Sequence, residues 1–398
     1  MIEQLKSAAL QQFIRSHENV EAADILFKYR DIEGVPAGVV VNQIAGRKKA
    51  GEKIPLYYNT PGILYPPLKN LEQSSSERTA VFKAQLLSEL SINGSCLDLS
   101  GGLGIDSYFL STVSKDITMV EPDVDLLAMA AYNHKLLGAT NIRHVNKKAA
   151  DFLSSFTDKF GLIYIDPSRR IEGNKKVYSL KDSEPNITTL HEEILQRSGY
   201  LLIKASPLLD IQRAISELSF VSKVFVLSVD NECKELLFLL TPEQKSDPDI
   251  IAVNLKKNGA SRLQFTFSEE KSAHVQLGLP KKYLYEPNAS ILKAGAFKTV
   301  GKMYNIDKLH SNTHLYSSEV MVPEFQGKVF RIIAYVKADS KVLKEYFPDG
   351  KANITVRNYP LDPSALKKKT RLTDGGDRFL IGFTGVDKKY LVVAQRAN

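Results

Sequence analysis

Hydrophobic and polar positions follow two different spacing patterns along this chain. The point where the pattern changes separates an N-terminal segment from the rest. Before Asn93-Gly94, apolar side chains recur three and four positions apart, which predicts amphipathic helices at 3–16, 20–30 and 36–50. A stretch rich in proline and tyrosine at 55–70 is typical of an extended connector. A further helix is expected after Ser76, because this serine can cap the apolar, helically spaced segment that follows.

After Asn93-Gly94, short apolar runs alternate with helical segments, which predicts an α/β domain. This pattern is typical of a doubly wound, Rossmann-like sheet of parallel strands with crossover helices. Only Asp230-Asn231-Glu232 joins the last two runs, and three residues are too few for a crossover, so these strands should form an antiparallel hairpin. The expected strands are 96–100, 117–122, 142–146, 161–166, 199–206, 223–229 and 234–240.

The remaining chain combines helical and strand-like spacing of apolar residues. Residues 250–325 carry strand signals and a helical piece around 290–297, and residues 328–398 alternate strand, helix and strand, which predicts α+β modules. The last segment is also strongly basic. From Lys328 to Asn398 there are 15 Lys and Arg against 7 Asp and Glu, an excess that equals the net charge of +8 of the whole chain. A basic module beside a near-neutral remainder indicates a polyanionic partner, with nucleic acid first, or else only a soluble basic surface.

Composition narrows the class of protein. A length of 398 residues, with 43% hydrophobic and 25% charged residues, is typical of a folded protein of two to four domains. No apolar run reaches the roughly 18 residues of a membrane helix, and the N-terminus does not read as a signal peptide. Because Cys96 and Cys233 are the only cysteines, a disulfide framework is not expected and a cytoplasmic location is.

A glycine-rich turn, "CLDLSGGLGID", follows the first sheet strand and opens a helix. Such a turn lets the backbone approach a ligand at the carboxyl edge of the sheet. An acid at Glu121, after the second strand, suits the two hydroxyls of a ribose, and Asp151 lies where an adenine amino group could be met. Nicotinamide-binding folds use a related turn, but theirs is G-x-G-x-x-G, whereas Gly104 is followed by Ser107 at the third position.

Asp98 also argues against a nicotinamide-binding fold. A carboxylate in this turn repels a pyrophosphate but suits the ammonium group of a methionine moiety. With the hairpin, these features resemble the class I S-adenosylmethionine-dependent methyltransferases over about residues 75–242. Ser100 in place of the first glycine is a mild departure from the family pattern. The resemblance implies S-adenosyl-L-methionine as cofactor and the following cofactor-binding residues: Asp98, Ser100, Gly101, Gly102, Gly104, Asp106, Glu121 and Asp151.

The fourth strand ends in "IDPSRR", beside the expected methyl donor. Many methyltransferases of nucleic-acid amino groups carry Asp/Asn-Pro-Pro-aromatic there, where the acid and the adjacent carbonyl orient the amine and positioning supplies most of the catalysis. This chain keeps Asp166 and Pro167 but has Ser168 and Arg169 in place of the second proline and the aromatic residue. We take these four as catalytic candidates, and Arg170 as a nucleic-acid contact. The arginines could hold a phosphate or base carbonyl, or pair with acids of the loop such as Glu172.

An Asp-Pro-Pro-Arg edge occurs in enzymes that methylate carbon 5 of uracil, but these need a cysteine nucleophile. Cys96 lies in the first strand, and Cys233 is expected to be buried and inert inside the sheet, so this mechanism is doubtful. Zinc is not expected either, because His310 and His314 lack a third ligand nearby.

Segments along the whole chain resemble a bacterial methyltransferase family with a small ferredoxin-fold insert and a C-terminal THUMP-like domain. The segments are "LEQSSSERTAVFKA", "IKASP", "DNECKELL", "YLYEPNASILKAGAF" and "ITVRNYP…KKKTRLTDGGDRFL". The resemblance implies an N-terminal helical region at 1–72, a class I methyltransferase domain at 73–245, a ferredoxin-like domain at 246–325 and a basic THUMP-like domain at 326–398.

Because THUMP domains proper belong to RNA-modifying enzymes, the resemblance implies RNA, either tRNA or rRNA, as substrate class, by analogy of fold. The densest basic run supplies the expected phosphate contacts Lys367, Lys368, Lys369 and Arg371, although a solvated helix face explains it equally well. The function predicted from the sequence is therefore methylation of an RNA base. Two alternatives stay open: a non-catalytic RNA-binding protein that keeps a cofactor fold, and a methyltransferase of a protein or small molecule.

Overall fold

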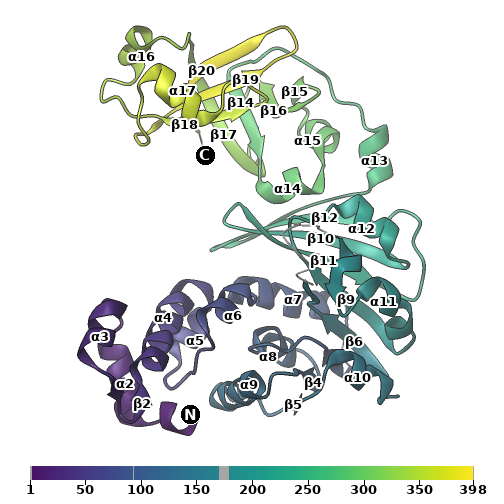
Figure 1. The fold of residues 1–398 in the computed structure, drawn as a ribbon. Helices are drawn as coiled ribbons and strands as arrows, with labels where there is room; N and C mark the ends of the chain where they lie inside the picture. Colours follow the sequence, from purple (N-terminus) through teal and green to yellow (C-terminus); the bar gives the residue numbers. More distant parts are fainter. Residues whose placement is uncertain (1, 93, 170–178, 398) are drawn as a thin grey trace. The chain divides into compact units, whose positions relative to one another are not determined.

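A computed structural model describes residues 2–92, 94–169 and 179–397 of the chain. The chain divides into two compact units, one formed by Met1–Ser222 and Leu236–Lys245, the other by Lys223–Glu235 and Ser246–Asn398. Figure 1 shows the order of the elements, coloured along the sequence. No helix in the described part of the chain has the length and apolar character needed to cross a membrane.

The N-terminal region is helical, as its spacing predicts, and the connector at 55–70 is partly helical too. Pro55 and Pro67 do not prevent this, because proline is tolerated at or just before the start of a helix. The expected extended connector is therefore wrong for 55–59 and from 68 onward. The helices of this region are α1 (Ile2–Leu5), α2 (Ala8–Ser16), α3 (Ala22–Lys28), α4 (Ala37–Lys53), α5 (Pro55–Asn59) and α6 (Leu68–Gln73), with the short strands β1 (Asp31–Ile32) and β2 (Val35–Pro36) between α3 and α4.

The connector packs against the glycine-rich turn. Tyr57 and Tyr65 belong to one buried apolar cluster with Leu103 and Ile105. The backbone of Leu64 exchanges two hydrogen bonds with the buried side chain of Asn133, of 3.0 and 2.8 Å. The N-terminal region thus supports the turn on which the expected cofactor site depends.

The large sheet has nine strands in the order β13-β12-β10-β11-β9-β6-β3-β4-β5. β3 pairs in parallel with β4 and β6, and β6 pairs in parallel with β9, as expected for a doubly wound sheet. The predicted hairpin is present: β10 and β11 are neighbours in the sheet, and Asp230 and Asn231, both at positive φ, form the turn between them. On its other side, β11 runs antiparallel to β9. The strands are β3 (Cys96–Asp98), β4 (Ile117–Val120), β5 (Ile142–Val145), β6 (Phe160–Ile165), β9 (Ser198–Ala205), β10 (Val221–Val229), β11 (Glu232–Leu240), β12 (Asp249–Lys256) and β13 (Gly259–Phe265).

Crossover helices connect the parallel strands. Ser76 caps the helix that precedes the first sheet strand by accepting a hydrogen bond from the Thr79 N–H, which confirms the predicted start. A ten-residue helix before β9 was missed, because its pattern follows the polar loop after the fourth strand. The elements are α7 (Glu77–Glu89), α8 (Ile105–Ser111), α9 (Val124–Leu136), α10 (Ala149–Ser154), the strand pair β7 (Ser168–Arg169) and β8 (Ser183–Glu184), the 3-10 helix η1 (Leu180–Asp182), α11 (Ile187–Gln196) and α12 (Ile211–Glu217).

Within the second unit, a seven-stranded sheet has the order β15-β16-β14-β17-β20-β19-β18. Residues 249–265, which the sequence pattern groups with the ferredoxin-like segment, form β12 and β13 beside β10 in the large sheet. The remaining elements are α13 (Phe267–Ser272), β14 (Tyr283–Pro287), α14 (Ala289–Ala294), α15 (Phe297–Tyr304), β15 (Asp307–His310), β16 (Thr313–Ser318), β17 (Gly327–Tyr335), α16 (Ser340–Tyr346), β18 (Asn353–Arg357), α17 (Pro363–Thr370), β19 (Arg378–Thr384) and β20 (Lys389–Arg396).

Candidate methyl-transfer site

Three acids reach the same edge of the large sheet. Asp98 ends β3, and Glu121 and Asp166 directly follow β4 and β6, the two parallel neighbours of β3. Parallel strands present their carboxyl ends at one edge, which is where open α/β sheets bind ligands. The glycine-rich turn donates a hydrogen bond to the Glu121 carboxylate and accepts one from the backbone N–H of Asp166, so these predicted residues form one connected group.

Glycine is required in the turn at Gly104. This residue has φ +76° and stands at the N-cap of α8. A Cβ added there would lie 2.4 Å from Cε1 of His134, which is fully enclosed beneath the turn. The imidazole is held from both sides, since its Nε2 lies 2.9 Å from the carbonyl oxygen of Gly104 and its Nδ1 lies 2.9 Å from Nε2 of His144. Burial lowers the pKa of His134 to about 4, so the ring is neutral and can donate to the carbonyl.

Asp98 lies inside the turn. Its carboxylate accepts hydrogen bonds from the Ser107 hydroxyl (2.6 Å), the Ser100 N–H (2.9 Å) and the Ser100 hydroxyl (3.1 Å). Burial raises the pKa of Asp98 to about 7, against the lowering effect of these donors. Through these three hydrogen bonds, the Asp98 side chain holds the turn in its conformation.

Ser100 connects the glycine-rich turn to the Asp-Pro edge. While its hydroxyl donates to Asp98, it accepts the backbone N–H of Asp166 at 2.6 Å. A glycine at this position would lack that hydroxyl. The departure from the family pattern at Ser100 thus provides a direct link between the two halves of the site.

Asp106 makes contacts that sequence reasoning did not foresee. Its carboxylate accepts hydrogen bonds from Lys83 Nζ (2.9 Å), the Ser75 hydroxyl (2.6 Å) and the Tyr164 hydroxyl (2.8 Å). Burial alone would raise the pKa of this carboxyl, but the ammonium groups of Lys83 and Lys204 bring it below its usual value. These contacts join α7, α8 and β6, so its direct cofactor contact stays a prediction.

Glu121 and Asp151 differ in burial and in hydrogen bonding. The Glu121 carboxylate is buried and accepts the N–H groups of Gly102 (2.7 Å) and Asp123 (2.9 Å). Each of its oxygens keeps a lone pair for a further donor, as ribose recognition would require. Asp151 lies exposed in the first turn of α10.

The Asp-Pro edge contains a partner that the sequence reasoning missed. Lys204, near the end of β9, places its Nζ 2.5 Å from Oδ2 of the half-buried Asp166. The motif "IKASP" contained this lysine, and its position at the carboxyl end of the neighbouring parallel strand was the available signal. Ser168 is exposed and donates to the carbonyl oxygen of Glu184 at 3.2 Å. The Arg169 backbone belongs to β7, while its side chain and all of Arg170 lie outside what the structure describes.

Neither cysteine is suited to nucleophilic catalysis. Burial raises the pKa of the Cys96 thiol to about 12 and that of Cys233 to about 11, so both are protonated at neutral pH. Cys233 is only partly buried, which corrects the prediction of a fully buried residue: it lies next to the exposed start of β11. Among the described residues, no group of three or more His, Cys, Asp or Glu side chains is arranged to hold a metal ion.

The basic run lies at the end of α17 in the second unit. Lys367, Lys368 and Lys369 occupy its last turn, and Arg371 follows at φ +59° as the C-cap. Lys367 pairs with Asp374 at 2.5 Å, whereas Lys368 and Lys369 are exposed. Cations there also interact favourably with the helix dipole, so the structure fits both a solvated helix end and a phosphate-binding surface.

Comparisons with known proteins give the family context. A model of a ferredoxin-like domain matches residues 283–325, and a model of a THUMP-like domain matches residues 327–396. A candidate methyltransferase of known structure from Porphyromonas gingivalis W83 is 29% identical, with 100% of this chain and 99% of that chain covered and a TM-score of 0.86. The predicted methyltransferase resemblance is confirmed.

More distant relatives agree with this result. An uncharacterized S-adenosylmethionine-dependent methyltransferase of Mycobacterium tuberculosis is 23% identical over 264 residues, which are 64% of this chain and 68% of that protein. An uncharacterized RNA methyltransferase of Mycoplasma mobile is 24% identical over 103 residues, 26% of this chain and 28% of that protein. The enzyme class and the cofactor predicted from the sequence are those named for the mycobacterial relative.

The residues at the sheet edge fit S-adenosylmethionine. A Cβ at Gly102 would meet nothing closer than 3.8 Å, so the outer face of the turn is open, while Gly101 and Gly104 pack against side chains beneath it. The Glu121 carboxylate lies beside the turn, where it suits a ribose but not a pyrophosphate, while the buried Asp98 holds the turn from within. The donor set and the open turn therefore agree with the predicted cofactor.

Proposed function

We propose that this chain is a cytoplasmic methyltransferase that transfers a methyl group from S-adenosylmethionine to a base of RNA. The observation that carries the proposal is the hydroxyl of Ser100 in the glycine-rich turn, which donates to Asp98 and accepts the backbone N–H of Asp166. Cofactor support and acceptor support thus share one rigid connection at the sheet edge. The cytoplasmic location rests on the two free cysteines.

The bound cofactor supplies a methyl group activated by its sulfonium sulfur, so the protein mainly has to position the acceptor. Glu121 would hold the ribose and the open face of Gly102 the methionine moiety. Lys204 engages Oδ2 of Asp166, which leaves Oδ1 available to accept a proton from an exocyclic amine. The Pro167 carbonyl would accept the second N–H, so that the nitrogen lone pair is aimed along one direction.

Two features support RNA as the acceptor. The THUMP-like match covers residues 327–396, the same segment that carries the basic excess of the chain. A relative bears the name of an RNA methyltransferase. Arg169, Arg170 and the cluster at Lys367–Arg371 would contact phosphates, which position RNA without reading its sequence.

The test is methyl transfer from labelled S-adenosylmethionine to RNA isolated from a strain that lacks the gene, with RNA from the parent strain as the already modified control. Asp166→Ala should lower the transfer rate by roughly 10²- to 10⁴-fold, because the oxygen that orients the acceptor amine is lost. Its affinity for S-adenosylmethionine should stay within about threefold, a change below 1 kcal/mol.

The matched control is Asp158→Ala, at an exposed acid just before the opposite end of the same strand, β6. It should leave the rate unchanged. Failure of the wild-type protein to methylate any RNA fraction would refute the proposal. Absence of measurable S-adenosylmethionine binding would then favour a non-catalytic RNA-binding protein, and salt-insensitive transfer without RNA retention would favour a protein or small-molecule substrate.

A further inference from the structure

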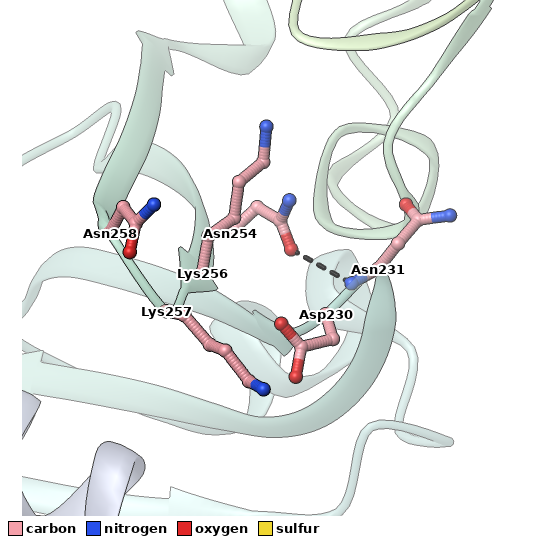
Figure 2. Close-up of a pocket in the computed structure, with 6 residues that line it drawn as sticks. All are labelled: Asp230, Asn231, Asn254, Lys256, Lys257 and Asn258. Carbon is pink, nitrogen blue, oxygen red and sulfur yellow. Dashed lines mark hydrogen bonds between the residues drawn. The ribbon is translucent and has the colours of Figure 1, made fainter.

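A polar hollow lies beyond the ends of two parallel strands in the second unit. β10 and β12 pair in parallel, and the turns that follow them, at Asp230-Asn231 and at Lys257-Asn258, border an open hollow of about 360 Å³. This volume is at the small end of the range for ligand sites. Figure 2 shows the residues that line it: Asp230, Asn231, Asn254, Lys256, Lys257 and Asn258.

Asn254 is the best-defined group in the hollow. It is only 2% exposed, and its Oδ1 accepts hydrogen bonds from the Ser228 hydroxyl (2.8 Å) and the Asn231 N–H (3.1 Å). A backbone N–H can only donate, so this contact fixes which end of the carboxamide is oxygen. The Nδ2 group then points away from these donors, and no residue that the structure describes accepts a hydrogen bond from it (Figure 2).

Although the Asn254 side chain as a whole is buried, its Nδ2 stays free to donate to water or to a ligand in the hollow. The support around Asn254 is rigid. Asn231 occupies positive φ in the hairpin turn, and its own Oδ1 accepts the Ala289 N–H at 2.7 Å. The donor is therefore presented by a fixed frame.

The charge around this donor is mainly positive. Lys256 and Lys257 are exposed, and neither forms an ion pair with any described residue. Asp230 is the single acid of the hollow and is itself engaged in an interaction. An anionic oxygen group suits one fixed amide donor with two ammonium groups, whereas a cation or an apolar ligand does not.

We propose that this hollow is a phosphate subsite for single-stranded RNA, in which Asn254 Nδ2 and the two lysines hold the backbone of the substrate. The inference rests on the proposed function, since RNA is the polyanion it supplies. It adds residues that the basic run at Lys367–Arg371 does not include. Compared with scattered surface lysines, the distinguishing feature is the fixed amide, which gives the site direction as well as charge.

The size of the effect follows from counterion release. For single strands, each neutralised phosphate contributes about 0.7 to the slope of log K against log salt, or roughly fivefold in affinity at about 0.1 M salt. Lys256→Gln/Lys257→Gln should therefore weaken binding by roughly five- to 25-fold, for one or two phosphates lost, and reduce the slope by about 0.7 to 1.4.

Asn254→Asp isolates the amide. One carboxylate oxygen still accepts from Ser228 and Asn231, while the other replaces the donor that faces the hollow and repels phosphate. The matched control is Lys48→Gln/Lys49→Gln, an exposed pair on α4 that changes the net charge equally. Thermal unfolding of all variants checks that each is folded.

The assay is fluorescence anisotropy of a labelled single-stranded RNA of about 15 nucleotides, titrated with the full chain at several salt concentrations. Weaker binding by both hollow variants, with the Lys48/Lys49 control at wild-type affinity, supports the subsite. Competition by inorganic phosphate at millimolar concentration would show instead a site for free phosphate and overturn the RNA assignment.

Equal affinities of the hollow variants and the control, in a wild-type protein that binds and methylates RNA, would overturn the inference and leave the proposed function intact. A wild-type protein that neither binds nor methylates RNA would overturn both. The two failures are therefore distinguishable.

Discussion

Replacing Gly104 with alanine tests the link between the glycine-rich turn and the histidine beneath it. The added Cβ meets two obstacles. At φ +76°, a left-handed conformation costs a residue with a side chain roughly 1 to 2 kcal/mol. The Cβ would also lie 2.4 Å from Cε1 and 2.5 Å from Nε2 of His134, far inside van der Waals contact.

His134 cannot easily move aside, because it is buried and bonded to Gly104 and His144 at 2.9 Å on both sides. Overpacking of this kind costs about 1 to 3 kcal/mol. Together the two effects predict a loss of about 2 to 5 kcal/mol in the free energy of unfolding of the first unit. S-adenosylmethionine binding should be lost as well, since the turn must shift to relieve the clash.

Gly138→Ala is the matched control. Gly138 has φ +77°, and a Cβ added there would meet no heavy atom within 4 Å, so this variant carries the backbone cost without the clash. Urea denaturation should give a loss of about 1 to 2 kcal/mol for this variant, with the transition of the first unit followed by hydrogen exchange of peptides from β4 and α8. Equal losses for the two variants would refute the argument that the His134 contact makes glycine necessary.

Two further predictions concern buried charges. Burial raises the pKa of Asp98 from 3.8 in the unfolded chain to about 7, so its stabilising contribution is complete below about pH 4 and is lost as the pH rises through 7. The free energy of unfolding of the wild-type protein, measured relative to Asp98→Asn by urea denaturation, should fall by up to roughly 4 kcal/mol over that range, and a flat difference would contradict the assigned burial. Lys83→Met should destabilise by about 3 to 5 kcal/mol, since it leaves the Asp106 carboxylate without its ammonium partner. Lys83→Met/Asp106→Asn, which keeps an acceptor for the Ser75 and Tyr164 hydroxyls, should recover most of this loss in the same assay, and an equal or greater loss in the double variant would exclude the ion pair as the cause.

Local patterns were sufficient to predict most of the framework. The strand runs, the Ser76 cap and the antiparallel hairpin each follow from side-chain spacing or connection length, and each is present. Helix α11 was missed because the sequence that leads into it is polar and its apolar face is short. The helices α5 and α6 were missed because Pro55 and Pro67 were read only as breakers, although proline also begins helices.

The site was less predictable because its contacts join distant segments. Ser100, Lys204 and Asp106 each bond to a partner on another element, and side-chain spacing carries no information on such pairs. Part of the site could be predicted from the strand order, because a parallel sheet must bring Asp98, Glu121 and Asp166 to one edge. The buried Asn254 had no sequence signal, because an asparagine in a strand next to two lysines resembles the start of an ordinary turn.

The bonds between Leu64 and Asn133 have a practical consequence for how this chain can be divided. A fragment that begins near residue 73 would retain every acid of the sheet edge, yet it would remove both partners of the Asn133 carboxamide and uncover Leu103 and Ile105 beside the glycine-rich turn. Such a fragment would keep the candidate catalytic and cofactor-binding side chains but lose the packing that holds the glycine-rich turn in place. Truncations and domain swaps should therefore keep the N-terminal helices and the methyltransferase sheet together. For the same reason, evolutionary recombination should transfer the two as one unit.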